Sequence, residues 1–292
     1  MSCPHKHVLI TGTSSGIGKA TMEAALAAGY HVLAGDRSAE PPPGGVIPDG
    51  EMLTRIRLDI TKQDEIDDAV ALVADHVGSA GLDGLANIAG IGIPGPLETM
   101  PMHDLRLSFD VDFFGQMALT QPCIPLLRMA RGRLVFVGSV ADRTTVPFFG
   151  ALASSKSAIA AAAGTLRQEL APWGIRVVLV EPGFISTGAD EATKARIDAL
   201  IDGFAPEQAA LYGQMFRTAT ERGYTVQTSG SSPEGVARVI VDAMQATRPK
   251  ARYLTGSKAH LMANLARLPT RLQDFARRKA FGQPRRADPP GP

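Results

Sequence analysis

Hydrophobic and polar positions along this chain follow two periods in turn, one typical of strands and one typical of helices. Short runs that are apolar throughout predict strands over residues 7–11, 30–35, 53–58, 82–88, 133–137, 175–180 and 252–254. Longer stretches with apolar residues every three or four positions predict helices over 16–28, 64–77, 102–129, 152–170, 233–245 and 259–279. Apolar strands separated by helices indicate a parallel sheet that is covered on both faces.

The regular alternation of strands and helices stops after Glu181. Residues 183–231 are polar and of loop-helix character, and we expect them to form a lid over a substrate. The segment 39–50 holds four prolines and three glycines and predicts a surface loop. Because no linker or repeat divides the chain, we expect one domain over 1–282, with a C-terminal helix within 256–282 and a disordered tail over 283–292.

Composition excludes several classes of protein. The chain has 292 residues, of which 45% are hydrophobic and 20% charged, and this is enough for a large α/β core. The formal net charge of +1 provides no broad basic field for nucleic acid. No apolar run reaches the roughly 18 residues of a membrane span, and the N-terminus lacks the apolar core of a signal peptide. We therefore expect a cytoplasmic protein without a nucleic-acid partner or membrane contact.

The cysteines and histidines of the sequence predict neither a disulfide nor a metal site. Cys3 and Cys123 cannot form a disulfide framework. His5 and His7 alternate near the N-terminus, but no third ligand lies close to them in sequence, so we expect no bound metal. The basic helix near the C-terminus would suit a membrane surface or a partner subunit, but we expect its basic side chains to be solvated.

A glycine-rich turn follows the first predicted strand and opens the first predicted helix. Glycine lets the backbone approach a pyrophosphate closely, and the helix N-terminus presents unpaired N–H groups. This context predicts a nucleotide site on a Rossmann-type, doubly wound parallel sheet of about seven strands. The turn residues expected to contact the nucleotide are Gly12, Ser14, Ser15, Gly16, Ile17 and Gly18.

Asp36 ends the second predicted strand, where an adenosine ribose would lie. A carboxylate there accepts hydrogen bonds from the ribose hydroxyls and repels a 2′-phosphate, which favours NAD. Arg37 beside it would instead pair with that phosphate. We favour NAD, and NADP remains the alternative.

The Gly-x-x-x-Gly-x-Gly spacing resembles the short-chain dehydrogenase/reductase superfamily, and further motifs follow in the family's order over residues 6–255. The C-terminal part is similar to the hydroxysteroid and retinol dehydrogenase-like branch. The resemblance implies further nucleotide contacts after the third strand (Asp59, Ile60), after the fourth (Asn87, Ala89, Gly90), on the next helix (Lys156) and after the sixth strand (Pro182, Gly183, Ile185, Thr187).

The family's catalytic set is a Ser, a Tyr and a Lys with a helical Asn behind them, and here it is incomplete. Ser139 and Lys156 match the set. The position of the Tyr, four residues before Lys156 and thirteen after Ser139, holds Leu152, and the position of the Asn holds Asp112. Leucine cannot act as a general acid, and losing such a group costs about 10²- to 10⁴-fold in rate. Asp112 is either half of a buried ion pair with Lys156 or a carboxyl that acts as acid or base.

Three functions follow from this resemblance. The first is an oxidoreductase that acts on a hydroxyl or carbonyl of a hydrophobic small molecule through an atypical proton relay, with Ser139, Lys156 and Asp112 as catalytic residues. The second is a non-redox cyclase, isomerase or dehydratase, for example in natural-product biosynthesis, in which Asp112 and Ser139 move protons and the nucleotide is structural. The third is a catalytically silent binding protein. An engineered Tyr-to-Leu change would also explain Leu152, but it would explain Asp112 less well.

We favour the oxidoreductase because so much of the nucleotide site is present. Ser139, Leu152 and Phe184 are the expected substrate contacts, and Phe204 and Phe216 in the lid suggest either an apolar pocket or packing of the lid. We expect Asp142 and Arg143 at a loop surface. Family members commonly pair through the two long helices, here near 102–129 and 152–170, which implies a homodimer or homotetramer.

Overall fold

A seven-stranded sheet organises the computed structural model, which describes residues 6–40, 52–186 and 190–286. Within these residues the strand order is β3-β2-β1-β4-β5-β6-β7, and every neighbouring pair is parallel. The bounds are β1 (Lys6–Thr11), β2 (Tyr30–Asp36), β3 (Leu53–Arg57), β4 (Gly84–Asn87), β5 (Arg133–Val137), β6 (Arg176–Pro182) and β7 (Arg252–Thr255). The predicted doubly wound sheet is confirmed. Its order reverses between β1 and β4, where such sheets open a crevice for ligands.

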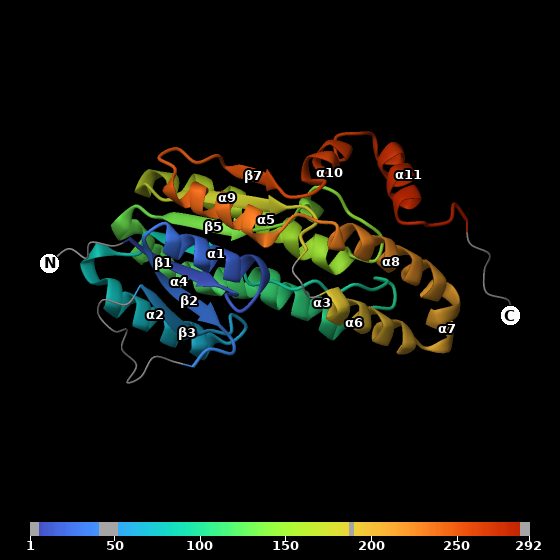
Figure 1. Ribbon diagram of the computed structural model, residues 1–292, viewed down its shortest axis with the longest axis horizontal. Helices are drawn as coiled ribbons and strands as arrows, with labels where there is room; N and C mark the ends of the chain where they lie inside the picture. Colours follow the sequence, from blue (N-terminus) through green and yellow to red (C-terminus); the bar gives the residue numbers. More distant parts are fainter. Residues whose placement is uncertain (1–5, 41–51, 187–189, 287–292) are drawn as a thin grey trace.

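Helices cover both faces of the sheet (Figure 1). α1 (Gly16–Ala27) and α9 (Pro233–Gln245) pack on one face, and α2 (Gln63–Val77), α4 (Gln116–Ala130) and α5 (Gly150–Glu169) cover the other. Strand residues alternate between these two cores: Phe136 of β5 belongs to the α2–α4–α5 side, and Val135 belongs to the α1–α9 side. Because both faces are buried, the strands are apolar at every position rather than at every second one.

The long helical stretch predicted over 102–129 contains a change of helix type. α3 (Met102–Phe109) continues into a π-helical turn over Asp110–Gly115, and α4 follows directly. Single π turns inside longer helices often occur at functional sites. Asp112 lies in this turn, where it is fully buried.

The segment expected to be a lid forms α6 (Asp190–Asp202), α7 (Pro206–Gln208) and α8 (Gln214–Thr228), which extend beyond one end of the sheet (Figure 1). Phe216 of α8 is fully buried, with its ring centroid 5.3 Å from that of Phe148 and 5.5 Å from that of Phe204. Of the two roles considered for these aromatic residues, the contacts correspond to packing of the lid.

The C-terminal region corrects the prediction of one helix over 259–279. Two helices form instead, α10 (Ala259–Leu265) and α11 (Thr270–Ala280). The helix is interrupted because Pro269 lacks an N–H donor and disfavours helical geometry in the residue before it. Arg277 was expected to be solvated, but its side chain is only 13% exposed and donates to the hydroxyls of Thr144 and Thr145.

The outer parts of the chain are only partly described. Gln283, the first residue of the expected tail, donates to the backbone oxygen of Met215. The rest of that tail from residue 287 lies outside the described residues, and so do residues 41–50 of the predicted surface loop. Among the helices that the structure describes, none has both the length and the apolar character needed to span a membrane.

Candidate active site

The glycine-rich turn between β1 and α1 is closed so tightly that side chains would not fit. Gly12 has φ +71°, and a Cβ there would lie 3.0 Å from the Cα of Ala89. A Cβ on Gly18 would lie 2.0 Å from the carbonyl oxygen of Gly12. The Ser15 side chain precedes α1 without capping it, so the N–H groups of the first helical turn remain available to an anion. The turn therefore fits a phosphate group, as the sequence predicts.

Asp36 lies at the C-terminal end of β2, beside this turn. One carboxylate oxygen accepts from the backbone N–H of Ser14 at 2.9 Å, and the other accepts from the N–H and hydroxyl of Ser38 at 2.8 and 2.5 Å. Burial alone would raise the pKa of Asp36, but the hydrogen bonds from Ser14 and Ser38 offset it, and the pKa is lowered. Asp36 is thus a fixed anion at neutral pH, whereas the neighbouring Arg37 is exposed.

The predicted contacts at the end of β4 form one connected structure. The hydroxyl of Thr11 accepts from the backbone N–H groups of Ile88 and Ala89, which joins the end of β4 to the glycine-rich turn. Asn87 is fully buried and donates to the Thr120 hydroxyl at 3.0 Å. Gly90 is exposed, and a Cβ there would lie 2.9 Å from Asp112 and 3.0 Å from Lys156. Gly90 therefore covers the pair formed by these two residues.

The remaining predicted nucleotide contacts lie along the same C-terminal edge of the sheet. Asp59 accepts from the N–H and hydroxyl of Thr61, and Ile60 is buried. Pro182 ends β6, and Gly183 donates to the backbone oxygen of Thr255 at 2.8 Å. Ile185 is buried in the α1–α9 core. Thr187 lies outside the described residues.

Lys156 and Asp112 form a buried ion pair in this region. The Lys156 ammonium lies 3.2 Å from Asp112 Oδ1 and donates to the backbone oxygen of Val137 at 3.4 Å. Asp112 also accepts from the backbone N–H of Ile91 at 3.0 Å and from the Ser155 hydroxyl at 2.8 Å. Of the two arrangements that the sequence left open for Asp112, the structure contains the ion pair. Asp112 thereby holds the ammonium in place at the end of β5.

Leu152 lies one helical turn before Lys156 on α5. Its side chain is half-buried and faces the loop at Gly92.

None of the four tyrosines, all of which lie among the described residues, takes the place of a tyrosine at position 152. Tyr30 is buried at the start of β2, Tyr224 of α8 lines a pocket that α6 shares, and the Tyr253 hydroxyl accepts from the backbone N–H of Lys250. Tyr212 donates to Glu98, and this hydrogen bond, together with burial, raises the pKa of Tyr212.

Ser139 follows β5 and begins a short 3-10 turn over Val140–Asp142. Its hydroxyl oxygen accepts from the backbone N–H of Ala141 at 3.1 Å. A serine hydroxyl has one donor and two acceptor positions, so this capping bond leaves its hydrogen available to donate. Capping and substrate contact are therefore compatible roles for Ser139. Phe184, the other expected substrate contact, is half-buried just after β6.

Asp142 and Arg143 do not lie at a loop surface, which corrects the expectation from the sequence. The Asp142 side chain is 3% exposed and pairs with Arg252, while Arg143 binds both carboxylate oxygens of Glu181 at 2.5 and 2.8 Å. Arg252 also contacts Glu181 at 2.7 Å. These four side chains join the turn after Ser139 to the end of β6 and the first residue of β7. The sequence did not single out Glu181 or Arg252 because the partners lie up to 110 residues apart.

The carboxyl of Asp142 is expected to make stability depend on pH. Burial and the nearby Glu181 raise its pKa to about 7. Because the folded state holds this proton more tightly than the unfolded state, the stabilisation is present at low pH and is lost as pH rises towards 7. We expect the wild type to lose roughly 2 kcal/mol more stability between pH 5 and pH 8 than Asp142→Asn. Urea unfolding at both pH values measures this, and parallel losses in the two proteins would contradict it.

A cleft of about 670 Å³ opens beside α5, but on a different face from Leu152 and Lys156. The α5 residues that line it, Gly150, Ala153, Ser154 and Ser157, repeat at helical spacing and form one stripe. Leu97, Phe148, Tyr212 and Arg277 complete much of its wall. This cleft therefore lies on the other side of α5 from the Lys156–Asp112 ion pair.

The fold and the glycine-rich turn define an α/β protein of dinucleotide-binding type, and comparison with known proteins gives its family. Residues 6–198 match the family model described as short chain dehydrogenase. The chain is similar to mouse (Mus musculus) retinol dehydrogenase 16, with 34% identity over 92% of this chain and 86% of that protein. It is also similar to NADPH-dependent 3-dehydrocapnine reductase from Ornithobacterium rhinotracheale, with 32% identity over 92% and 95% of the two chains.

Solved structures agree with this comparison. A short-chain dehydrogenase from Streptomyces avermitilis superposes with a TM-score of 0.71, at 26% identity and over 96% of both chains. The chain therefore belongs to the short chain dehydrogenase family.

Proposed function

We propose that this protein binds NAD(H) and moves hydride between its nicotinamide and the hydroxyl or carbonyl carbon of a hydrophobic small molecule. The observation that carries this proposal is the closed glycine turn with the fixed anion Asp36 at its rim. Among the relatives, retinol dehydrogenase 16 is named for an alcohol with a large apolar body. A bound nicotinamide would supply or accept the hydride, and the protein's own residues would have to manage the accompanying proton.

Ser139 is the group best placed to orient the substrate oxygen. Its hydroxyl oxygen is held by the Ala141 N–H, so its hydrogen points away from the bond it accepts and can donate to a carbonyl or alkoxide oxygen. Such a donor stabilises the charge that develops on the oxygen during hydride transfer. Ser139 is therefore assigned the role of the oxygen-binding residue.

Lys156 is the fixed source of positive charge at the same place. An ammonium has three donors, of which Asp112 and the Val137 oxygen use two. The third is left for a ribose hydroxyl or for a water molecule. Because Leu152 cannot carry a proton, we infer that water held by Lys156 exchanges the proton with the substrate oxygen. Asp112 acts in this scheme as a positioning residue.

The non-redox function is less well supported by the same contacts. An acid or base must reach the substrate, yet the Asp112 carboxylate is fully buried and engaged by Lys156, Ile91 and Ser155. A silent binding protein would not need the Lys156 ammonium to be fixed beside the nucleotide edge of the sheet. Redox chemistry therefore remains our preferred proposal.

The charge at Asp36 is expected to decide the choice of cofactor. We expect the wild type to bind NADH at least about tenfold more tightly than NADPH, and Asp36→Asn to reduce that ratio about tenfold, which corresponds to about 1.4 kcal/mol. Fluorescence titration with both nucleotides measures the ratio. Arg37→Ala is the matched control next to it and should leave NADH binding unchanged. Failure of both nucleotides to bind would refute the proposed function, whereas tighter NADPH binding would reassign the cofactor.

Association through the two long helices remains a proposal as well. Met102 and Leu107 of α3 and Phe114 of the π-helical turn are 41–56% exposed, and α5 carries the exposed small residues Ser154 and Ser157. Exposed apolar side chains beside a small-residue stripe suit the interface of a homodimer or homotetramer. A cytoplasmic location likewise stays a prediction.

A further inference from the structure

Three histidines gather at the edge of the sheet that is opposite to the nucleotide site. His7 and His31 are the second residues of β1 and β2, and the two are directly paired in the parallel register. His76 lies in the last turn of α2. Because α2 runs back along the sheet, its C-terminal end meets the N-terminal ends of the strands. The three histidines are therefore far apart in the sequence but close together in the folded chain.

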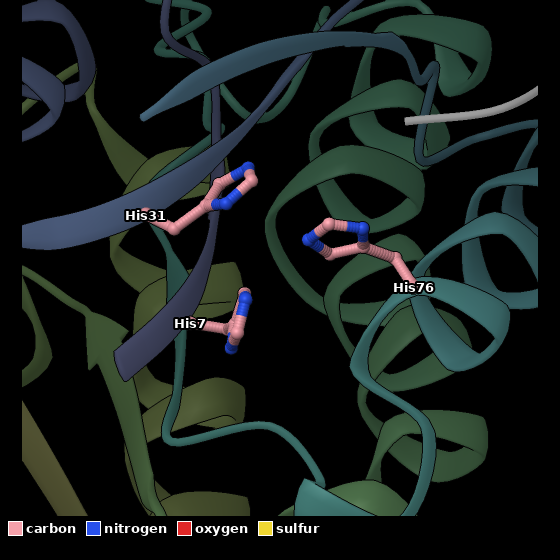
Figure 2. Close-up of side chains that lie close together, drawn as sticks. All are labelled: His7, His31 and His76. Carbon is pink, nitrogen blue, oxygen red and sulfur yellow. The ribbon is translucent and has the colours of Figure 1, made fainter. Parts of the chain in front are cut away.

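The three side chains point into a common space between the sheet and α2 (Figure 2). Each offers one ring nitrogen, and these three nitrogens lie within 4.8 Å of one another. The ring centroids are separated by 4.7–5.1 Å. His7 and His31 are 1% and 4% exposed, and His76 is half-buried.

We propose that His7, His31 and His76 bind a divalent transition-metal ion, with Zn²⁺ as the first choice. Neutral imidazole is a good ligand for Zn²⁺, and three protein ligands with a water in the fourth position form a common tetrahedral site. Zinc–nitrogen bonds of about 2.0–2.1 Å place the nitrogens of such a site about 3.4 Å apart. Small rotations of the side chains would bring the three nitrogens from their present separation to that distance.

The surroundings of the cluster suit a bound cation. His31 Nε2 lies 3.3 Å from the Thr54 hydroxyl. An outer hydrogen bond of this kind commonly orients metal-binding histidines. The C-terminal end of α2 carries a partial negative charge beside His76. Asp83 accepts from the backbone N–H of His7 and adds a carboxylate at this edge.

An ion at this place would have a structural role. It would tie the first two strands to the end of α2, at the edge of the sheet remote from Ser139 and Lys156. Because it would bind the folded chain and not the unfolded one, it would stabilise the fold by mass action. Nucleotide binding should therefore be the same with and without the metal, which makes this proposal independent of the proposed enzyme activity.

The test uses the full chain without a polyhistidine tag, equilibrated with Zn²⁺ and freed of loosely held ion by gel filtration. We expect close to one zinc per chain by elemental analysis, and Co²⁺ in place of zinc should give the intense visible absorption of a tetrahedral site. With free Zn²⁺ about 100-fold above Kd, the thermal midpoint should rise by about 4 °C. A chelator should reverse the shift.

Two variants and a matched control locate the ion. His76→Gln and His31→Gln should each lower the bound zinc at least tenfold and remove the thermal shift. His103→Gln changes a histidine whose side chain is 80% exposed on α3, and it should keep both. His76→Gln lies at a partly exposed helix end, so circular dichroism should show it folded. A wild type that retains no zinc, or zinc binding that is equal in His76→Gln and His103→Gln, overturns the proposal.

Discussion

Leu152→Tyr is expected to raise the rate of NADH-linked carbonyl reduction by about 10²-fold or more. The position lies one helical turn before Lys156, so a phenol there would project on the same face of α5 as the ammonium. A hydroxyl with a nearby cation can pass a proton to the substrate oxygen directly, in place of the water that we propose. Steady-state kinetics with one ketone or aldehyde substrate measures the change, which should lie mainly in kcat.

Leu152→Phe is the matched control because it adds the same ring without the hydroxyl. Any gain shared by the Phe and Tyr variants would come from packing against the loop at Gly92, which Leu152 faces. A Tyr variant no faster than the Phe variant would contradict proton transfer at this position. Turnover in the Tyr variant alone, with none in the wild type, would count against native redox chemistry and favour a non-redox or binding role.

Lys156→Met is expected to reduce the free energy of unfolding by about 3–5 kcal/mol. The substitution removes the only cation that pairs with Asp112 among the described residues and leaves a fully buried carboxylate with the hydrogen bonds from Ile91 and Ser155 alone. An unpaired buried charge is costly because it has lost water without gaining an opposite charge. Urea unfolding followed by circular dichroism measures the loss.

The double variant Lys156→Met, Asp112→Asn separates charge from packing. The neutral amide should recover most of the stability lost in the single variant, because it no longer buries an unpaired charge. If the single variant is as stable as the wild type, or if the double variant regains none of the lost free energy of unfolding, the buried charge of Asp112 does not depend on Lys156 for its stabilisation. Cofactor titration of the same proteins would show separately whether Lys156 also contacts the nucleotide.

Much of the fold could be predicted because strands, helices and tight turns depend on the residue types within short segments. Wholly apolar runs such as the one in β5 can be stable only between two covered faces, and this indicated the parallel sheet. The glycine turn was equally clear, because a Cβ at Gly18 would collide with the backbone of Gly12. The interruption at Pro269 could also have been inferred from proline alone, yet the basic periodicity around it suggested one continuous helix.

Long-range contacts could not be predicted in the same way. Asp142 was expected at a surface, but it is buried with Arg252, which lies 110 residues away in the chain. His7, His31 and His76 are separated by 24 and 45 positions, and they meet only because β1, β2 and α2 end at one edge of the sheet. Glu181 was seen only as the end of a strand, although two arginines converge on it.

The sequence alone determined the sheet, the phosphate-binding turn and the absence of a tyrosine at position 152, because each depends on residue type and spacing within a short segment. Only the tertiary structure decided that Asp112 pairs with Lys156, that Asp142 is buried and that three histidines converge. Ion pairing, burial and metal ligation depend on distances between side chains from different elements, and those distances are set when the elements pack together.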